Sequence, residues 1–185
     1  MAQYHWITYT SEQAKFNVES DPDMPLTTGD KLPNAFLGHL GEKGPEQVDI
    51  NAKIKGKKVV IFALPGAFTP TCSAAHMPSF IRTADQLRAK GVDAIICISV
   101  NDIFVMKAWA DATGATGAGI HCLADGDSSF TKAVGMDYST PETGMMSRSK
   151  RYAMIVEDNI VTALNVEEAR GVCDLSGGET ILDLL

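Results

Sequence analysis

The sequence predicts an α/β fold in which helices flank a central mixed sheet. Two continuous apolar runs, residues 57–64 and 92–100, are typical of strands that are buried on both faces. A helical pattern follows each run, and connections of that kind place two strands parallel and side by side. Residues 152–157 and 160–166 are two further apolar runs, separated only by Asp158 and Asn159, and they indicate an antiparallel hairpin. Parallel and antiparallel pairs therefore meet in one sheet.

The longest helix is expected over residues 71–90. Its apolar residues recur at helical spacing on one face, and they are Met77, Phe80, Ile81, Ala84 and Leu87. Pro78 removes one backbone hydrogen bond near the start and is expected to bend this helix. Gly91 marks the end of the helix.

Shorter elements complete the expected order. They are a helix that begins at Asn101 or Asp102 and runs through Ala112, a strand at 120–123, a helix near 127–134, a loop at 135–148, and a terminal helix at 180–185 capped near Ser176.

Length and composition indicate one globular domain. The chain has 185 residues, of which 45% are hydrophobic and 21% are charged. Residues 1–27 are polar and lack sustained periodicity, so we interpret them as an N-terminal extension to a domain at 28–185.

Charge excludes some partners. The formal net charge of −7 argues against nucleic acid and against an anionic membrane surface. No apolar stretch approaches the roughly 18 residues that a membrane span needs. The first residues show neither a signal-peptide pattern nor an Arg-rich transit pattern, which predicts a cytoplasmic protein, although an organellar protein without its targeting segment would look the same.

The four cysteines, Cys72, Cys97, Cys122 and Cys173, form no Cys-x-x-Cys pair and no zinc-binding spacing. A reducing compartment with one or two reactive thiols explains them better than a disulfide scaffold. We expect no metal or other cofactor.

Cys72 is the first candidate for chemistry. It follows a buried strand and the loop that begins with Pro65 and Gly66, at the point where the long helix starts. The unpaired N–H groups and positive dipole end of a helix favour the thiolate, which is the nucleophilic form. A cysteine beside an apolar strand is more often a small buried hydrophobe. The prolines and threonine of this loop favour the reactive interpretation.

The same segment resembles a known signature. Residues 65–78, PGAFTPTCSAAHMP, resemble the active-site motif of the peroxiredoxins, in particular the peroxiredoxin-five or plant type II subfamily. Further blocks at 91–109, 148–154 and 163–167 match in the family's order, so the resemblance covers roughly residues 28–185. It implies a thioredoxin-like fold and a thiol peroxidase.

The resemblance also implies roles for four residues. Cys72 would attack the peroxide, Thr69 would orient it, Pro65 would shield the thiolate from water, and Arg151 would stabilise charge and donate hydrogen bonds. Three of them also have a purely structural interpretation: threonine favours such loops, proline ends strands, and an arginine at a strand start is often solvated. Arg148 is a weaker candidate that could brace a neighbouring acid.

His76 lies one helical turn after Cys72 and has two interpretations. It could be the base for the thiol, but a structural role near a subunit contact is favoured, because the helix dipole and Arg151 already supply a thiolate. By resemblance the protein forms a homodimer, with the face around His76, Met77 and Pro78 near the contact. Phe104 and Trp109 fit either the core or the dimer surface.

Attack on peroxide leaves a sulfenic acid, which a second thiol can capture as a disulfide. Cys97 stands where plant type II members carry the resolving cysteine, but it lies inside an apolar strand. Cys173 lies in a glycine-containing loop near where vertebrate members carry theirs. Cys122 is expected in a core strand. One-cysteine chemistry with an external thiol is the third possibility.

The sequence therefore predicts a peroxidase for hydrogen peroxide and small alkyl hydroperoxides. Glutathione, glutaredoxin or thioredoxin would recycle it, and its role would be antioxidant defence and redox homeostasis. A thiol–disulfide oxidoreductase is disfavoured because Cys-x-x-Cys is absent. A non-enzymatic redox sensor or partner-binding protein, switched by oxidation of Cys72, is the alternative.

Overall fold

The computed structural model describes residues 25–185. The predicted extension therefore lies almost entirely outside the described residues, and the boundary at residue 28 stays a prediction. Within the described part, Leu26 packs into the core and its N–H donates to the carbonyl of Val134.

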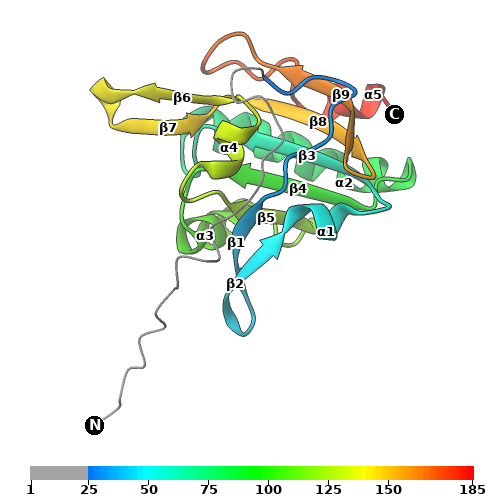
Figure 1. Cartoon of the computed structure of the whole chain (residues 1–185), viewed down its shortest axis with the longest axis horizontal. Coiled ribbons are helices and arrows are strands. Elements are labelled where there is room, and N and C mark those ends of the chain that lie inside the picture. Colours follow the sequence, from blue (N-terminus) through cyan, green and yellow to red (C-terminus); the bar gives the residue numbers. More distant parts are fainter. Residues whose placement is uncertain (1–24) are drawn as a thin grey trace.

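A seven-stranded mixed sheet forms the centre of the molecule, in the order β2-β1-β5-β4-β3-β8-β9 (Figure 1). Its three central strands are parallel and the outer ones are antiparallel to their neighbours, which confirms the predicted fold class. The strands are β1 (Phe36–Gly41), β2 (Gly44–Asp49), β3 (Lys58–Leu64), β4 (Ala94–Ser99), β5 (Ile120–Ala124), β8 (Tyr152–Glu157) and β9 (Ile160–Val166).

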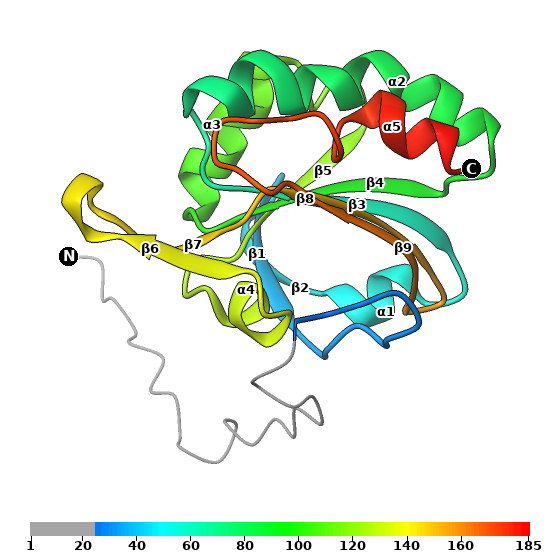
Figure 2. The same ribbon diagram turned by 90° about the horizontal axis from the view of Figure 1, so that it is seen from above.

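Helices cover both faces of this sheet (Figure 2). One face carries α2 (Met77–Ala89), α3 (Ile103–Thr113) and α5 (Gly178–Asp183), and the other carries α1 (Ile50–Ile54) and α4 (Ser129–Ala133). The strands of β3, β4 and β8 are almost wholly buried, because apolar side chains on both of their faces pack against these two helical layers. Within the described residues, no helix is both long and apolar enough to cross a membrane.

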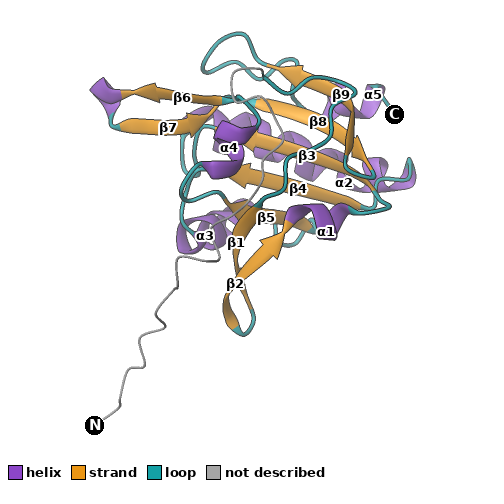
Figure 3. Cartoon of the chain, in the orientation of Figure 1, coloured by secondary structure: helices purple, strands orange, loops and turns teal. Residues whose placement is uncertain are grey.

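The predicted loop at 135–148 is wrong. These residues form a two-stranded arm of β6 (Asp137–Thr140) and β7 (Met145–Ser149), joined by a 3-10 turn at Pro141–Thr143 (Figure 3). The arm projects from the body of the molecule (Figure 2), so its strands carry few buried apolar residues and show no strand pattern in the sequence. Backbone pairing and the bond from Arg170 to the Thr140 hydroxyl, 2.7 Å, hold it in place.

The structure also determines where two of the helices begin. Asp102, one of the two predicted caps, accepts hydrogen bonds from the N–H groups of Phe104 and Val105 and so begins α3. The terminal helix α5 begins at Gly178 and not at Thr180, with Gly177 at its cap position in place of the expected Ser176. The start of α5 packs so closely on α2 that residue 178 must be glycine, because a Cβ there would lie 2.4 Å from the Thr83 hydroxyl.

Candidate active site

Cys72 lies where the carboxyl end of β3 leads into the helix, as the sequence predicts. Its side chain is fully buried, and residues 72–76 form a π-helical turn that continues directly into α2. Pro78 lies at the second position of α2, directly after this π-helical turn. A single π-turn in a helix is a frequent feature of functional sites. Just before the helix, Phe68 adopts a positive φ of 59°, a conformation that is strained for a non-glycine residue.

The loop before Cys72 is anchored to the end of β4. The Asn101 side-chain oxygen accepts hydrogen bonds from the Ala67 N–H, 2.9 Å, and from the Ser99 hydroxyl, 2.9 Å. Gly66 makes this approach possible, because a Cβ there would lie 3.3 Å from the Thr69 side chain and close to Asn101. These hydrogen bonds hold the loop against the end of β4, and they thereby fix the position of Cys72, which follows the loop.

Strand register brings Arg151 to the same place. Tyr152 at the start of β8 pairs with Ala63 of the antiparallel β3, so Arg151 lies beside the end of β3 from which the Cys72 loop departs. Arg151 as a whole is 5% exposed. Its Nη2 donates to the Cys72 sulfur at 3.4 Å and its Nη1 to the His76 Nδ1 at 3.1 Å. Its Nε is buried without a hydrogen-bond partner among the described residues.

The charge of Arg151 has an unusual environment. Among residues 25–185, no carboxylate lies within ion-pair distance of this guanidinium. A buried cation without an anion is costly, by several kcal/mol in order of magnitude. The Cys72 sulfur is the group in contact with Arg151 that can become an anion.

His76 is held as a neutral ring. Its Nε2 donates to the Ser176 carbonyl at 3.0 Å, so Nδ1 carries no proton and accepts from Arg151. Burial, reinforced by the Arg151 charge, lowers the pKa of His76 to about 3. The ring contacts Arg151 and not the Cys72 sulfur, which favours the structural interpretation of this residue over the base. His76 and Met77 are fully buried within the chain, so of the three residues expected near a dimer contact only the partly exposed Pro78 has surface to offer.

The other predicted residues surround this cluster. The Thr69 hydroxyl donates to the Gly66 carbonyl at 2.8 Å, so here its proton lies on the loop backbone. Pro65 and Arg151 both line a cavity of about 460 Å³, which also touches Tyr138 and Arg170. Arg148 donates to the Val100 carbonyl, so it braces a backbone group and not the neighbouring acid that the sequence suggested.

The remaining cysteines lie in different surroundings. Cys97 on β4 and Cys122 on β5 are buried among apolar side chains, whereas Cys173 is half-buried in the loop before α5. Burial raises the pKa of Cys97 and, against the opposing charge of Arg151, the pKa of Cys173. All four thiols are free. Within residues 25–185, no group of three His, Cys, Asp or Glu side chains is arranged to hold a metal ion.

Known proteins share this arrangement of sequence and fold. Residues 27–182 match the Redoxin family. The chain is 47% identical to peroxiredoxin-2C of rice (Oryza sativa subsp. japonica), over 87% of this chain and 99% of that one. It is 45% identical to the rice chloroplastic peroxiredoxin-2E-2, over 86% and 72%. A mitochondrial peroxiredoxin-2F of Arabidopsis thaliana also matches.

Solved structures agree. The crystal structure of reduced Prx3 from Vibrio vulnificus in complex with H2O2 is 51% identical, with a TM-score of 0.81 and coverage of 86% of this chain and 98% of that chain. The chain belongs to the Redoxin family, and within it to the type II peroxiredoxins. It is a thiol peroxidase with a thioredoxin-like fold, as the sequence predicts.

In this peroxiredoxin, the structure brings Cys72, Arg151, Pro65 and Thr69 to one end of the sheet. Sequence reasoning missed two supporting residues, Asn101 and Ser176. Asn101 was considered only as a helix cap, although its place directly after a parallel strand is where binding and anchoring residues gather. Ser176 acts through its backbone carbonyl, which leaves no signal in the sequence.

Neutral His76 makes stability depend on pH. The folded protein keeps His76 unprotonated down to about pH 3, whereas the unfolded chain takes up a proton below the ordinary pKa of 6.5. Stability is therefore lost as the pH falls below 6.5, by about 2 kcal/mol at pH 5 at 1.36 kcal/mol per pH unit. We predict that His76→Gln removes this part of the loss, measured by denaturant unfolding between pH 8 and pH 5. Parallel pH curves for the variant and the wild type would show that His76 titrates normally.

Proposed function

We propose that Cys72 is the peroxidatic sulfur and that Arg151 is its counter-ion. The observation that carries this proposal is the buried guanidinium that contacts Cys72 and His76 with no carboxylate in ion-pair distance among the described residues. A thiolate at Cys72 neutralises that charge. The same contact makes the sulfur a nucleophile.

The reaction is a displacement at oxygen. The Cys72 thiolate attacks one peroxide oxygen, the O–O bond breaks, and the sulfur becomes a sulfenic acid. The departing oxygen takes a proton and leaves as water from H2O2 or as an alcohol from an alkyl hydroperoxide. Negative charge grows on that oxygen, so a fixed hydrogen-bond donor nearby accelerates the step.

Arg151 has a donor available for that purpose. Two of its nitrogens are engaged with Cys72 and His76, while its Nε has no partner among the described residues. Because Arg151 and Pro65 both line a cavity, we propose that peroxide approaches the site through it. Thr69 orients the peroxide once its hydroxyl turns from the Gly66 carbonyl to the substrate, and Pro65 limits access of water to the sulfur.

Recycling consumes thiols. We propose glutathione, glutaredoxin or thioredoxin as the reductant, and antioxidant defence and redox homeostasis as the role. A cytoplasmic location fits the reducing conditions that four free thiols need. The chloroplastic and mitochondrial relatives make organelles the alternative locations.

Cys173 is the resolving thiol that this geometry favours over Cys97. Cys173 is half-buried and feels the charge of Arg151, whereas Cys97 is fully buried and is influenced in the same way by Cys72. Its loop touches the start of the helix, because the Thr71 hydroxyl donates to the Gly171 carbonyl at 3.2 Å. Cys97 has no exposed surface and could reach Cys72 only if the helix start unwinds.

The homodimer is proposed to use an exposed aromatic surface. Phe68 and Phe104 are 59% and 61% exposed, whereas Trp109 is fully buried. The Asn101 bond to Ala67 holds the start of α3 against the loop that carries Phe68. Aromatic residues are enriched in protein interfaces, so we propose that these two phenylalanines lie at the subunit contact.

The first prediction concerns the peroxide step. Cys72→Ser should abolish H2O2 consumption, and Arg151→Ala should slow the second-order rate by roughly 100-fold or more, because a fixed donor and counter-ion are lost. Stopped-flow tryptophan fluorescence and a peroxide assay with a thiol reductant measure both. Arg82→Ala, which breaks only an exposed ion pair, is the control. Retained turnover in Cys72→Ser would overturn the assignment, and fast oxidation without turnover would indicate a sensor.

The second prediction concerns the resolving thiol. One equivalent of H2O2 should produce a Cys72–Cys173 disulfide, detected by peptide mass spectrometry with free thiols blocked. Because the pKa of Cys173 is raised, this step should be faster at higher pH. Cys173→Ser should stop at the sulfenic acid, while Cys97→Ser should behave as wild type. A Cys72–Cys97 disulfide, or three free thiols beside oxidised Cys72, would contradict the choice.

The third prediction concerns assembly. Light scattering at micromolar concentration should find a dimer, and Phe104→Glu should shift it toward monomer because it places a charge in an apolar contact. Leu184→Glu, at another exposed apolar position, is the control. A monomeric wild type would contradict the proposed dimer. Equal effects of the two variants would mean that the subunit contact does not involve Phe104.

A further inference from the structure

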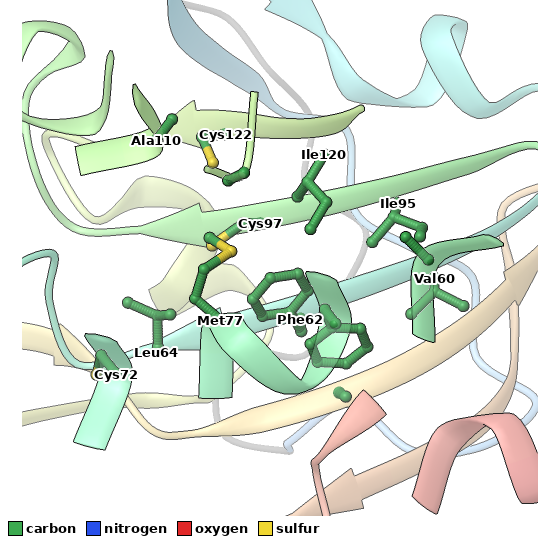
Figure 4. Packing of buried hydrophobic residues seen from close by; sticks show 14 of the residues in the cluster. Val60, Phe62, Leu64, Cys72, Met77, Ile95, Cys97, Ala110, Ile120 and Cys122 are labelled. Carbon is green, nitrogen blue, oxygen red and sulfur yellow. The ribbon is translucent and has the colours of Figure 1, made fainter. Parts of the chain in front are cut away.

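Two cysteines outside the Cys72 site face each other across neighbouring strands. Cys97 on β4 and Cys122 on β5 are register partners in a parallel pair. Both side chains belong to the core cluster beneath α2 and α3, and Figure 4 shows them in that cluster. Neither takes part in the Arg151 cluster.

The spacing of this pair suits a disulfide. Neighbouring strands lie about 4.8 Å apart, and disulfides join cysteines whose Cα atoms are about 4.4–6.8 Å apart. Cys97 and Cys122 are direct partners with side chains on the same face of the sheet, so their Cα atoms lie within this range. A disulfide also needs the two Cβ atoms at about 3.5–4.5 Å, which side-chain rotation and a local shift of the two strands must supply.

The two thiols differ in access. Cys122 is 7% exposed and lines a cavity of about 470 Å³ between α3, β1 and β5, whereas Cys97 has no exposed surface. Burial and the neighbouring Cys122 thiol raise the pKa of Cys97, so Cys97 keeps its proton. A reagent in the cavity therefore meets Cys122 first, and Cys97 lies directly behind it.

The cavity is lined by both apolar and polar residues. Ile103, Met106 and Ala110 are among the apolar ones. The polar ones include His39, whose Nδ1 contacts the Cys122 carbonyl, and Lys107, which pairs with Asp111, together with His121 and Glu42. A cavity of this volume is within the usual size range for a small ligand.

We propose that Cys122 and Cys97 form a second thiol–disulfide exchange site, which takes a low-molecular-weight disulfide such as oxidised glutathione from this cavity. The inference adds to the proposed function, because peroxide reduction driven by a small thiol releases the disulfide that this site consumes. Its chemistry does not involve Cys72.

The exchange has two balanced steps. Cys122 gives its proton to solvent in the cavity and attacks one sulfur of the disulfide, so a Cys122 mixed disulfide forms and one thiolate leaves and takes up a proton. Cys97, as it loses its proton, attacks the Cys122 sulfur and releases the second thiol. The protein pair is oxidised by two electrons to a Cys97–Cys122 disulfide, and the small disulfide is reduced to two thiols.

The test uses the full chain with Cys72→Ser and Cys173→Ser, so that only the pair remains. Incubation with oxidised glutathione should give a Cys97–Cys122 disulfide by non-reducing peptide mass spectrometry. Adding Cys97→Ser should leave a stable glutathione adduct on Cys122. Adding Cys122→Ser instead should leave Cys97 a free thiol, and this is the matched control.

Free Cys122 after this treatment, or equal modification of Cys97 in the Cys122→Ser variant, would overturn the proposal. Circular dichroism establishes that each variant is folded. Should a variant be unfolded, wild-type protein treated with oxidised glutathione in the absence of peroxide decides the question by the same peptide map. H2O2 consumption by the wild type tests the proposed function separately, so the two can fail independently.

Discussion

The contact between the Arg151 guanidinium and the Cys72 sulfur is the interaction around which this end of the molecule is organised. A cation that is 5% exposed, with no carboxylate in reach among the described residues, is tolerated only if its contacts compensate for lost hydration. A neutral His76 and a sulfur that can carry charge provide these contacts. In the proposed mechanism, one pair of side chains would therefore both neutralise a buried charge and supply the nucleophilic sulfur.

Three parts of the chain must agree for that pair to form. The antiparallel register of β8 on β3 places Arg151 at the end of β3. The Asn101 side chain fixes the loop that delivers Cys72, and the Ser176 carbonyl fixes the ring of His76. Ser176 is itself held by the buried carboxylate of Glu167. The loop before α5 therefore fixes His76, and through His76 it fixes Arg151. The loop that carries Cys173 is connected to the site by these hydrogen bonds.

The sheet, its two helical layers and the place of Cys72 could be predicted, because buried strands and an amphipathic helix leave continuous apolar patterns. The arm at 137–149 and the hairpin of β1 and β2 could not, since their strands are half-exposed and are held by backbone pairing. Within the site, residue type and position indicate Cys72, whereas Arg151 is indicated only by the resemblance of its surrounding residues to the family. The partner of His76 could not be deduced, because it is a backbone carbonyl 100 residues away in the sequence.

The four thiols illustrate how far the surroundings, and not the residue type, decide what a cysteine does. Cys72 is as buried as Cys97, yet only Cys72 has a guanidinium donor against its sulfur. Cys97 has apolar neighbours and another thiol, so its proton is retained and its pKa is raised. A thiol with no exposed surface becomes reactive only where a fixed cation replaces the water that it has lost, whereas Cys122 keeps some contact with the cavity. By that rule, Cys97 can enter exchange only after a partner sulfur has already been made electrophilic beside it, and Cys122, its register partner at the edge of a cavity, is the sulfur in that position.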